Sequence, residues 1–130
     1  MAPPPSSSTE RRPERLKRRA DFVRATRARN SAGTPGLVLQ AFARPAHELE
    51  GPSGTAPRVG FTASRKVGNA VARNRAKRRL RALADEMLKR HASDGHDYVL
   101  IARQSTVTRN FTALRADLVR SLKKLKLWQD

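Results

Sequence analysis

This chain of 130 residues contains no cysteine. Disulfide bonds, thiolate metal sites and catalysis by a cysteine nucleophile are therefore excluded. Acidic residues are also scarce, because 11 Asp and Glu stand against 28 Lys and Arg, which gives a formal charge of +17. Such an excess of one sign disfavours a compact state through self-repulsion. A polyanionic partner is therefore expected, with nucleic acid the first candidate and an anionic membrane surface the second.

Long hydrophobic runs are missing as well. No apolar stretch approaches the roughly 20 residues that a membrane-spanning helix needs. The N-terminal residues lack the apolar segment of a secretory signal, so a cytoplasmic location is expected. Aromatic residues make up only 5% of the chain, and its most basic segment lacks the Trp- and Phe-rich face of a helix that inserts at a membrane surface. We therefore expect no membrane partner.

Groups for acid–base or metal chemistry are few and scattered. The three histidines, His47, His91 and His96, fall in or near predicted loops. The carboxylates occur singly, whereas a protein nuclease site needs clustered carboxylates or histidines. The sequence therefore predicts no catalytic residue and no metal ligand.

The pattern of the chain predicts one domain. Residues 1–12 are rich in Pro and Ser and are expected to form a disordered tail, followed by a domain over residues 13–127. Within it, residues 44–57 hold three Pro and two Gly, which is typical of a variable surface loop.

Periodicity predicts an α/β sandwich in the order α-β-β-α-β-α, with an extra short strand possible. Helices are expected over residues 13–29 and 70–90, and strands over 37–43, 58–64 and 98–102. A last helix is expected to begin after Thr108 or Asn110, either of which suits a helix N-cap. The strands 58–64 and 98–102, joined by a helix, predict a parallel crossover, and such crossovers are almost always right-handed.

The most basic segment is KVGNAVARNRAKRRLR, residues 66–81, in which seven residues are Lys or Arg and none is acidic. If residues 70–90 form a helix, apolar residues of this segment and of the residues after it lie on one stripe: Ala72, Ala76, Leu80, Leu83 and Met87. Most of the basic side chains point away from this stripe, although Arg73 projects close to it. An ordinary solvated face is the alternative interpretation, but such faces usually mix charges of both signs. Binding to phosphate groups explains the pattern better.

This segment, from Arg65 to Arg81 and entered from the strand RVGFTAS, resembles the signature of the bacterial ribonuclease P protein subunit. The segment RLKRRADFVRA is similar to the first helix of that family, and GHDYVLIAR is similar to its late strand. Together the similar segments span most of residues 13–122 and leave the tail and the loop 44–57 unmatched.

The resemblance implies a protein subunit of a ribonucleoprotein endoribonuclease that removes the 5′ leader of precursor tRNA. It implies that the catalytic centre and its Mg²⁺ ions belong to the RNA subunit and the substrate, with no metal bound by the protein alone. The implied partners are the catalytic RNA and precursor tRNA, with no obligate protein partner. It also implies that the βαβ crossover is left-handed, against the general rule.

The resemblance further implies two groups of RNA-binding residues. The group that faces the RNA subunit comprises Arg65, Lys66, Asn69, Arg73, Asn74, Arg75, Lys77, Arg78 and Arg81. The pre-tRNA leader is expected in a cleft between the first helix and the sheet, where it contacts the aromatic residues Phe22, Phe42 and Phe61. Plain core packing is the alternative role for Phe22. Two positions that are often aromatic in the family hold Thr26 and Gln40, so leader stacking is expected either to be weaker or to rely on Phe42, Phe61 or Tyr98. A non-catalytic RNA-binding structural protein, such as a ribosomal component, is the alternative function.

Overall fold

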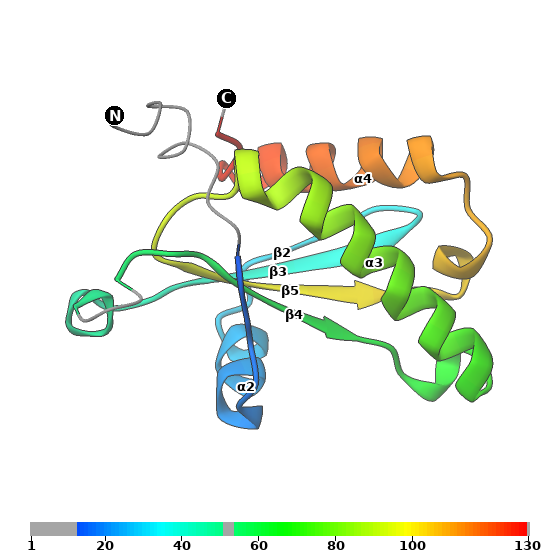
Figure 1. Cartoon of the computed structure of the whole chain (residues 1–130), viewed down its shortest axis with the longest axis horizontal. Coiled ribbons are helices and arrows are strands. Elements are labelled where there is room, and N and C mark those ends of the chain that lie inside the picture. Colours follow the sequence, from blue (N-terminus) through cyan, green and yellow to red (C-terminus); the bar gives the residue numbers. More distant parts are fainter. Residues whose placement is uncertain (1–12, 51–53, 130) are drawn as a thin grey trace, which may run out of the picture.

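The computed structural model describes residues 13–50 and 54–129, so the predicted tail lies outside the described residues. Its middle layer is a five-stranded sheet in the order β1-β4-β5-β3-β2. The helices α3 (Ala70–His91) and α4 (Phe111–Lys124) cover one face of the sheet, and α2 (Arg19–Arg27) covers the other (Figure 1). This arrangement confirms the predicted α/β sandwich. Over the described ranges, no helix combines the length and the apolar character needed to cross a membrane.

The three long strands form where the sequence predicted them. They are β3 (Leu37–Ala43), β4 (Arg58–Thr62) and β5 (His96–Ala102). β4 and β5 lie side by side and run parallel, with Arg58 opposite Asp97, and α3 connects them. The predicted parallel crossover is therefore confirmed, while its left hand stays an expectation from the resemblance. Two short strands, β1 (Glu14–Arg15) and β2 (Ser31–Gly33), form the edges of the sheet, one more than the sequence suggested.

The prediction of one helix over residues 13–29 is wrong in its first part. Glu14 and Arg15 extend the sheet, with the Glu14 amide donating to Pro57 O at 2.9 Å and the Leu16 amide to Val59 O at 2.8 Å. Leu16 is then buried between the sheet and α2. Pairing with the edge of β4 satisfies these amides, and this long-range gain outweighs a helix-compatible local pattern.

Alternation along the strands divides the apolar residues between two cores. Val59, Phe61 and Leu100 point to the larger core, which packs against the buried leucines of α3 and α4. Val99 points to the opposite face and packs in a smaller core with Leu16 and Ala25. The sheet therefore separates the α3 layer from the α2 layer.

The basic segment enters its helix through a glycine and an asparagine. Gly68 has φ 145°, a conformation that favours glycine because it has no Cβ. Asn69 caps α3, accepting a hydrogen bond from the Ala72 amide at 2.9 Å. At α4 the cap is Asn110, one of the two residues that the sequence allowed. In the predicted loop 44–57, η1 (Ala46–Leu49) forms a short 3₁₀ turn, and residues 51–53 lie outside the described residues.

Candidate nucleic-acid interface

The N-terminal half of α3 presents cations along its exposed side. Ala76, Leu80 and Leu83 are fully buried, which confirms most of the predicted apolar stripe. Asn74, Arg75, Arg78 and Arg81 are exposed, whereas Lys77 and Arg73 are half-buried. The half-buried state of Arg73 agrees with its predicted place beside the stripe. The helix therefore offers a basic surface that follows one face for about three turns.

The turn before α3 extends this basic surface. Arg65 and Lys66 lie in η2 (Arg65–Val67), and both side chains are exposed. Val67 is buried and anchors the turn to the core. Asn69 is also exposed, but its side-chain oxygen is used for the helix cap. We therefore assign Asn69 a structural role at the start of α3 alongside its predicted role in RNA binding.

Two arginines of α3 hold the turn η3 (Gln104–Val107) in place. Arg79 donates from Nη1 to Thr106 O at 2.6 Å and from Nη2 to Arg109 O. Arg75 donates from Nε to Val107 O at 3.1 Å. Burial, together with the charge of Arg75, lowers the pKa of Arg79. Arg79 therefore fixes η3 to α3. Arg75 also fixes η3 to α3 and remains exposed at the basic surface.

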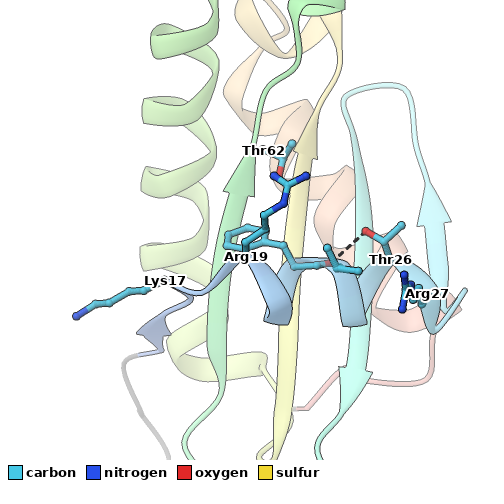
Figure 2. A pocket seen from close by; sticks show the side chains of 7 residues that line it. Lys17, Arg19, Thr26, Arg27 and Thr62 are labelled. Carbon is cyan, nitrogen blue, oxygen red and sulfur yellow. Dashed lines mark hydrogen bonds between the residues drawn. The ribbon is translucent and has the colours of Figure 1, made fainter.

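A cleft of about 590 Å³ lies along α2 on the opposite face of the sheet. We call it the α2 cleft; its lining residues are Lys17, Arg19, Phe22, Val23, Thr26, Arg27 and Thr62. Figure 2 shows Arg19 extending from α2 toward Thr62, which lies at the end of β4. Of the described residues that line this cleft, none carries a carboxylate and three are cationic. It is therefore suited to a single strand with a negatively charged backbone.

The aromatic ring of Phe22 rests on a glycine of β4. A Cβ built on Gly60 would lie 2.4 Å from two ring atoms of Phe22 and 3.2 Å from Leu16 Cβ. Phe22 is half-buried, so its ring is packed against the sheet and also borders the cleft. Packing of Phe22 in the core and contact of its ring with a strand in the cleft are therefore compatible in this structure.

The other two predicted aromatics are placed differently. Phe42 shares the α2 face of the sheet, but the guanidinium of Arg24 covers its ring at 4.3 Å. Phe61 is buried on the other face, in the core against α3. The prediction that Phe61 lies with Phe22 at the cleft is wrong, because adjacent residues of a strand point to opposite faces and Gly60 holds the cleft position. Sequence reasoning missed Lys17, Arg19, Arg27 and Thr62, although the basic run around Phe22 was a visible signal.

Ion pairs fix α2 to the sheet on the side away from the cleft. The buried carboxylate of Asp97 accepts from Arg58 Nε at 2.8 Å and Nη2 at 2.7 Å, and Arg44 Nε lies 3.2 Å from it. Arg24 of α2 contacts the same carboxylate at 3.5 Å and donates to Glu48 at 2.6 Å. The hydrogen bond to Asp97 raises the pKa of Arg58, and the hydrogen bond from Arg24 lowers the pKa of Glu48. The position of α2, and so the width of the α2 cleft, depends on this network.

Possible metal ligands do not gather anywhere in residues 13–50 and 54–129. No three side chains of His, Asp or Glu lie close enough together there to hold an ion. The acidic groups of the α2 layer are instead paired with arginines.

Comparison with known proteins gives one consistent result. The family model described as Ribonuclease P matches residues 11–126. A ribonuclease P protein component of Paramagnetospirillum magneticum is 46% identical over 112 residues, which cover 86% of this chain and 82% of that protein. Another, of Ruegeria pomeroyi, is 52% identical over 111 residues and covers 85% of this chain and 84% of that protein.

Solved structures agree with the sequence comparison. The RNase P protein of Staphylococcus aureus superposes with a TM-score of 0.69 at 29% identity, over 88% of this chain and 97% of that one. The RNase P protein of Thermotoga maritima gives a TM-score of 0.62 at 25% identity, over 87% of this chain and 96% of that one.

Proposed function

Because this chain belongs to the ribonuclease P protein family, we propose that it binds the catalytic RNA of ribonuclease P and the 5′ leader of precursor tRNA. In this proposal the RNA subunit, with Mg²⁺ held by it and by the substrate, hydrolyses the phosphodiester bond at the 5′ end of the tRNA. The protein positions the RNA subunit and the leader relative to each other and takes no part in bond cleavage.

The observation that carries the proposal is the presence of two cationic surfaces on opposite faces of one sheet. The basic surface of α3 and η2 contains no exposed carboxylate between Arg65 and Arg81, and it suits the phosphates of a folded RNA. The α2 cleft contains one aromatic ring between cations, and it suits a single strand.

The two surfaces meet at one point of the chain. Thr62 lines the α2 cleft, and Arg65 opens the basic surface after only Ala63 and Ser64. A strand leaving the cleft at Thr62 therefore arrives beside the RNA held by α3. This continuity is what joint binding of the leader and the catalytic RNA requires.

Reconstitution tests the proposal. Precursor tRNA is incubated at low Mg²⁺ concentration with the RNA subunit alone, with the protein alone, and with both together. We expect cleavage by the mixture to exceed cleavage by the RNA subunit, and no cleavage by the protein alone. Cleavage by the protein alone would contradict the assignment of catalysis to RNA. Absence of stimulation would favour a structural RNA-binding role, such as that of a ribosomal component.

A further inference from the structure

The solvent side of α2 extends the cationic lining of the α2 cleft beyond the cleft itself. Four residues at helical spacing make up this outer α2 face: Arg19, Ala20, Val23 and Arg27. Together with Arg24 they surround a shallow hollow of about 570 Å³. Two small apolar side chains at its centre leave space between the longer arginines.

The described part of the chain does not balance the charge of this face. The one carboxylate of α2, Asp21, lies 3.5 Å from Arg58 and 3.7 Å from Arg24, within the ion-pair network. Arg24 itself is neutralised by Glu48 and Asp97. Within the described residues, neither Arg19 nor Arg27 forms an ion pair. An ordinary solvated helix face would mix both signs of charge, so this face is poised for an anion outside the protein.

The outer α2 face is continuous with the α2 cleft. Arg19, Val23 and Arg27 line both the hollow and the cleft, so these residues form a ridge between them. The basic surface of α3 lies on the other side of the sheet (Figure 1). A strand held in the cleft is therefore nearer to the outer α2 face than an RNA docked on α3 is.

We propose that the leader crosses this ridge, so that its nucleotides farther from the cleavage site bind the outer α2 face through their phosphates. Arg19 and Arg27 supply the charge, and the small side chains of Ala20 and Val23 allow the backbone of the strand to approach. Ala20 and Val23 carry no hydrogen-bonding atoms, and in this proposal the guanidinium groups of Arg19 and Arg27 donate to phosphates and leave the bases unread. The interaction is therefore independent of leader sequence and increases with leader length. This inference rests on the proposed binding of the leader in the cleft.

The test compares leaders of increasing length with two matched variants. Ala20→Glu places a carboxylate on the outer α2 face at an exposed helical position that does not line the cleft. Ala116→Glu makes the same change at an exposed position of α4, in the opposite layer. The dissociation constant of precursor tRNA is measured with the reconstituted enzyme for each protein and each leader.

We expect the wild type and Ala116→Glu to bind more tightly as the leader lengthens, and Ala20→Glu to lose at least about threefold of that gain. With the shortest leaders all three proteins should bind equally. An undiminished gain in Ala20→Glu would overturn the inference and make the outer α2 face an ordinary solvated surface. Equal weakening at every leader length would also overturn it, because the face would then contact the RNA subunit or the tRNA body. If the wild type shows no dependence on the leader at all, it is the proposed cleft that fails.

Discussion

Thr26 of α2 and Gln40 of β3 lie within hydrogen-bonding distance, with Thr26 Oγ1 3.3 Å from Gln40 Oε1. The same hydroxyl lies 3.1 Å from the carbonyl oxygen of Phe22, one helical turn earlier (Figure 2). With a single proton the hydroxyl donates to one of them at a time. Two positions where the family resemblance leads one to expect aromatic rings thus form a polar pair at the α2 cleft.

Thr26→Phe should tighten binding of the leader. The new ring lies one turn from Phe22 on the same side of α2, and stacking on one nucleotide base contributes about 1–3 kcal/mol. We expect a gain of about tenfold in affinity, measured by titrating labelled precursor tRNA into the reconstituted enzyme. Thr26→Val is the control, since it removes the hydroxyl without adding a ring. Equal affinity of the two variants would mean that position 26 does not contact the leader.

Gly60→Ala should displace α2. The added methyl group would overlap the ring of Phe22, which a built Cβ approaches to 2.4 Å. Strain of this kind in a packed core costs about 1–3 kcal/mol, which urea denaturation can measure. A smaller side chain at position 22 should relieve it, so Gly60→Ala combined with Phe22→Leu should cost less than the sum of the two single changes. Additive costs would show that the ring is not what the methyl group meets.

The long elements were predictable because their signals are local. β3 is a run of strand formers, and α3 combines an apolar stripe with Asn69 as its cap. The start of the chain was not predictable in the same way. Residues 13–18 carry a helix-compatible pattern, yet Glu14 and Leu16 pair with β4, more than 40 residues away. Only contact with that distant edge decides their conformation.

In the candidate site, too, features with a local sequence signal could be predicted and features set by long-range pairing could not. The basic face of α3 follows from helical spacing alone, so its exposed cations were predicted correctly as a surface. The aromatic side of the α2 cleft depends on which face of the sheet each strand residue occupies. Phe61 was misplaced because its face is set by strand pairing. Phe42 lies on the α2 face, but Arg24 covers its ring and it is not among the described residues that line the cleft. Neither fact has a signature within a few residues of sequence.

Asp97→Asn should destabilise the protein strongly. The carboxylate is fully buried and contacts Arg24, Arg44 and Arg58. Its neutralisation therefore removes the counter-charge of the buried Arg44 guanidinium, while Arg24 and Arg58 keep Glu48 and Asp21 as partners. Removing one partner of a buried ion pair typically costs about 3–5 kcal/mol. The comparison is with Asp85→Asn at an exposed position of α3, which should change the free energy of unfolding by about 0.5 kcal/mol or less. Similar urea midpoints for the two variants would contradict the anchoring role of Asp97.

Although Arg78 and Arg79 are neighbours, Arg78→Ala should affect RNA binding and Arg79→Ala should affect stability. Arg78 is exposed, so its removal should leave the free energy of unfolding unchanged. The slope of the logarithm of the RNA-binding constant against the logarithm of salt concentration should become shallower by about 0.7–0.9 for each phosphate that Arg78 neutralises. Arg79 binds the carbonyl oxygens of Thr106 and Arg109, so its removal should lower stability by about 1.5–3 kcal/mol. Salt titrations of RNA binding and urea denaturation measure the two effects. The assignment fails if Arg78→Ala unfolds more easily than Arg79→Ala.

Ionisation of Tyr98 should lower the free energy of unfolding at alkaline pH. Burial raises the pKa of Tyr98 from 10.0 to about 12, and its hydroxyl accepts from the Ser93 amide at 2.8 Å. Because the folded pKa lies above the unfolded value, the contribution to stability is complete below pH 10 and is lost as the pH rises toward 12.

The loss should amount to about 2–3 kcal/mol across that interval. Tyr98→Phe carries no titrating hydroxyl, so its free energy of unfolding should start lower, because the Ser93 amide loses its acceptor, and then fall less steeply with pH. Urea denaturation at a series of pH values compares the two proteins, and the deprotonation of lysines affects both equally. Parallel pH profiles would mean that Tyr98 ionises without unfolding the core in which α3, α4 and the sheet meet.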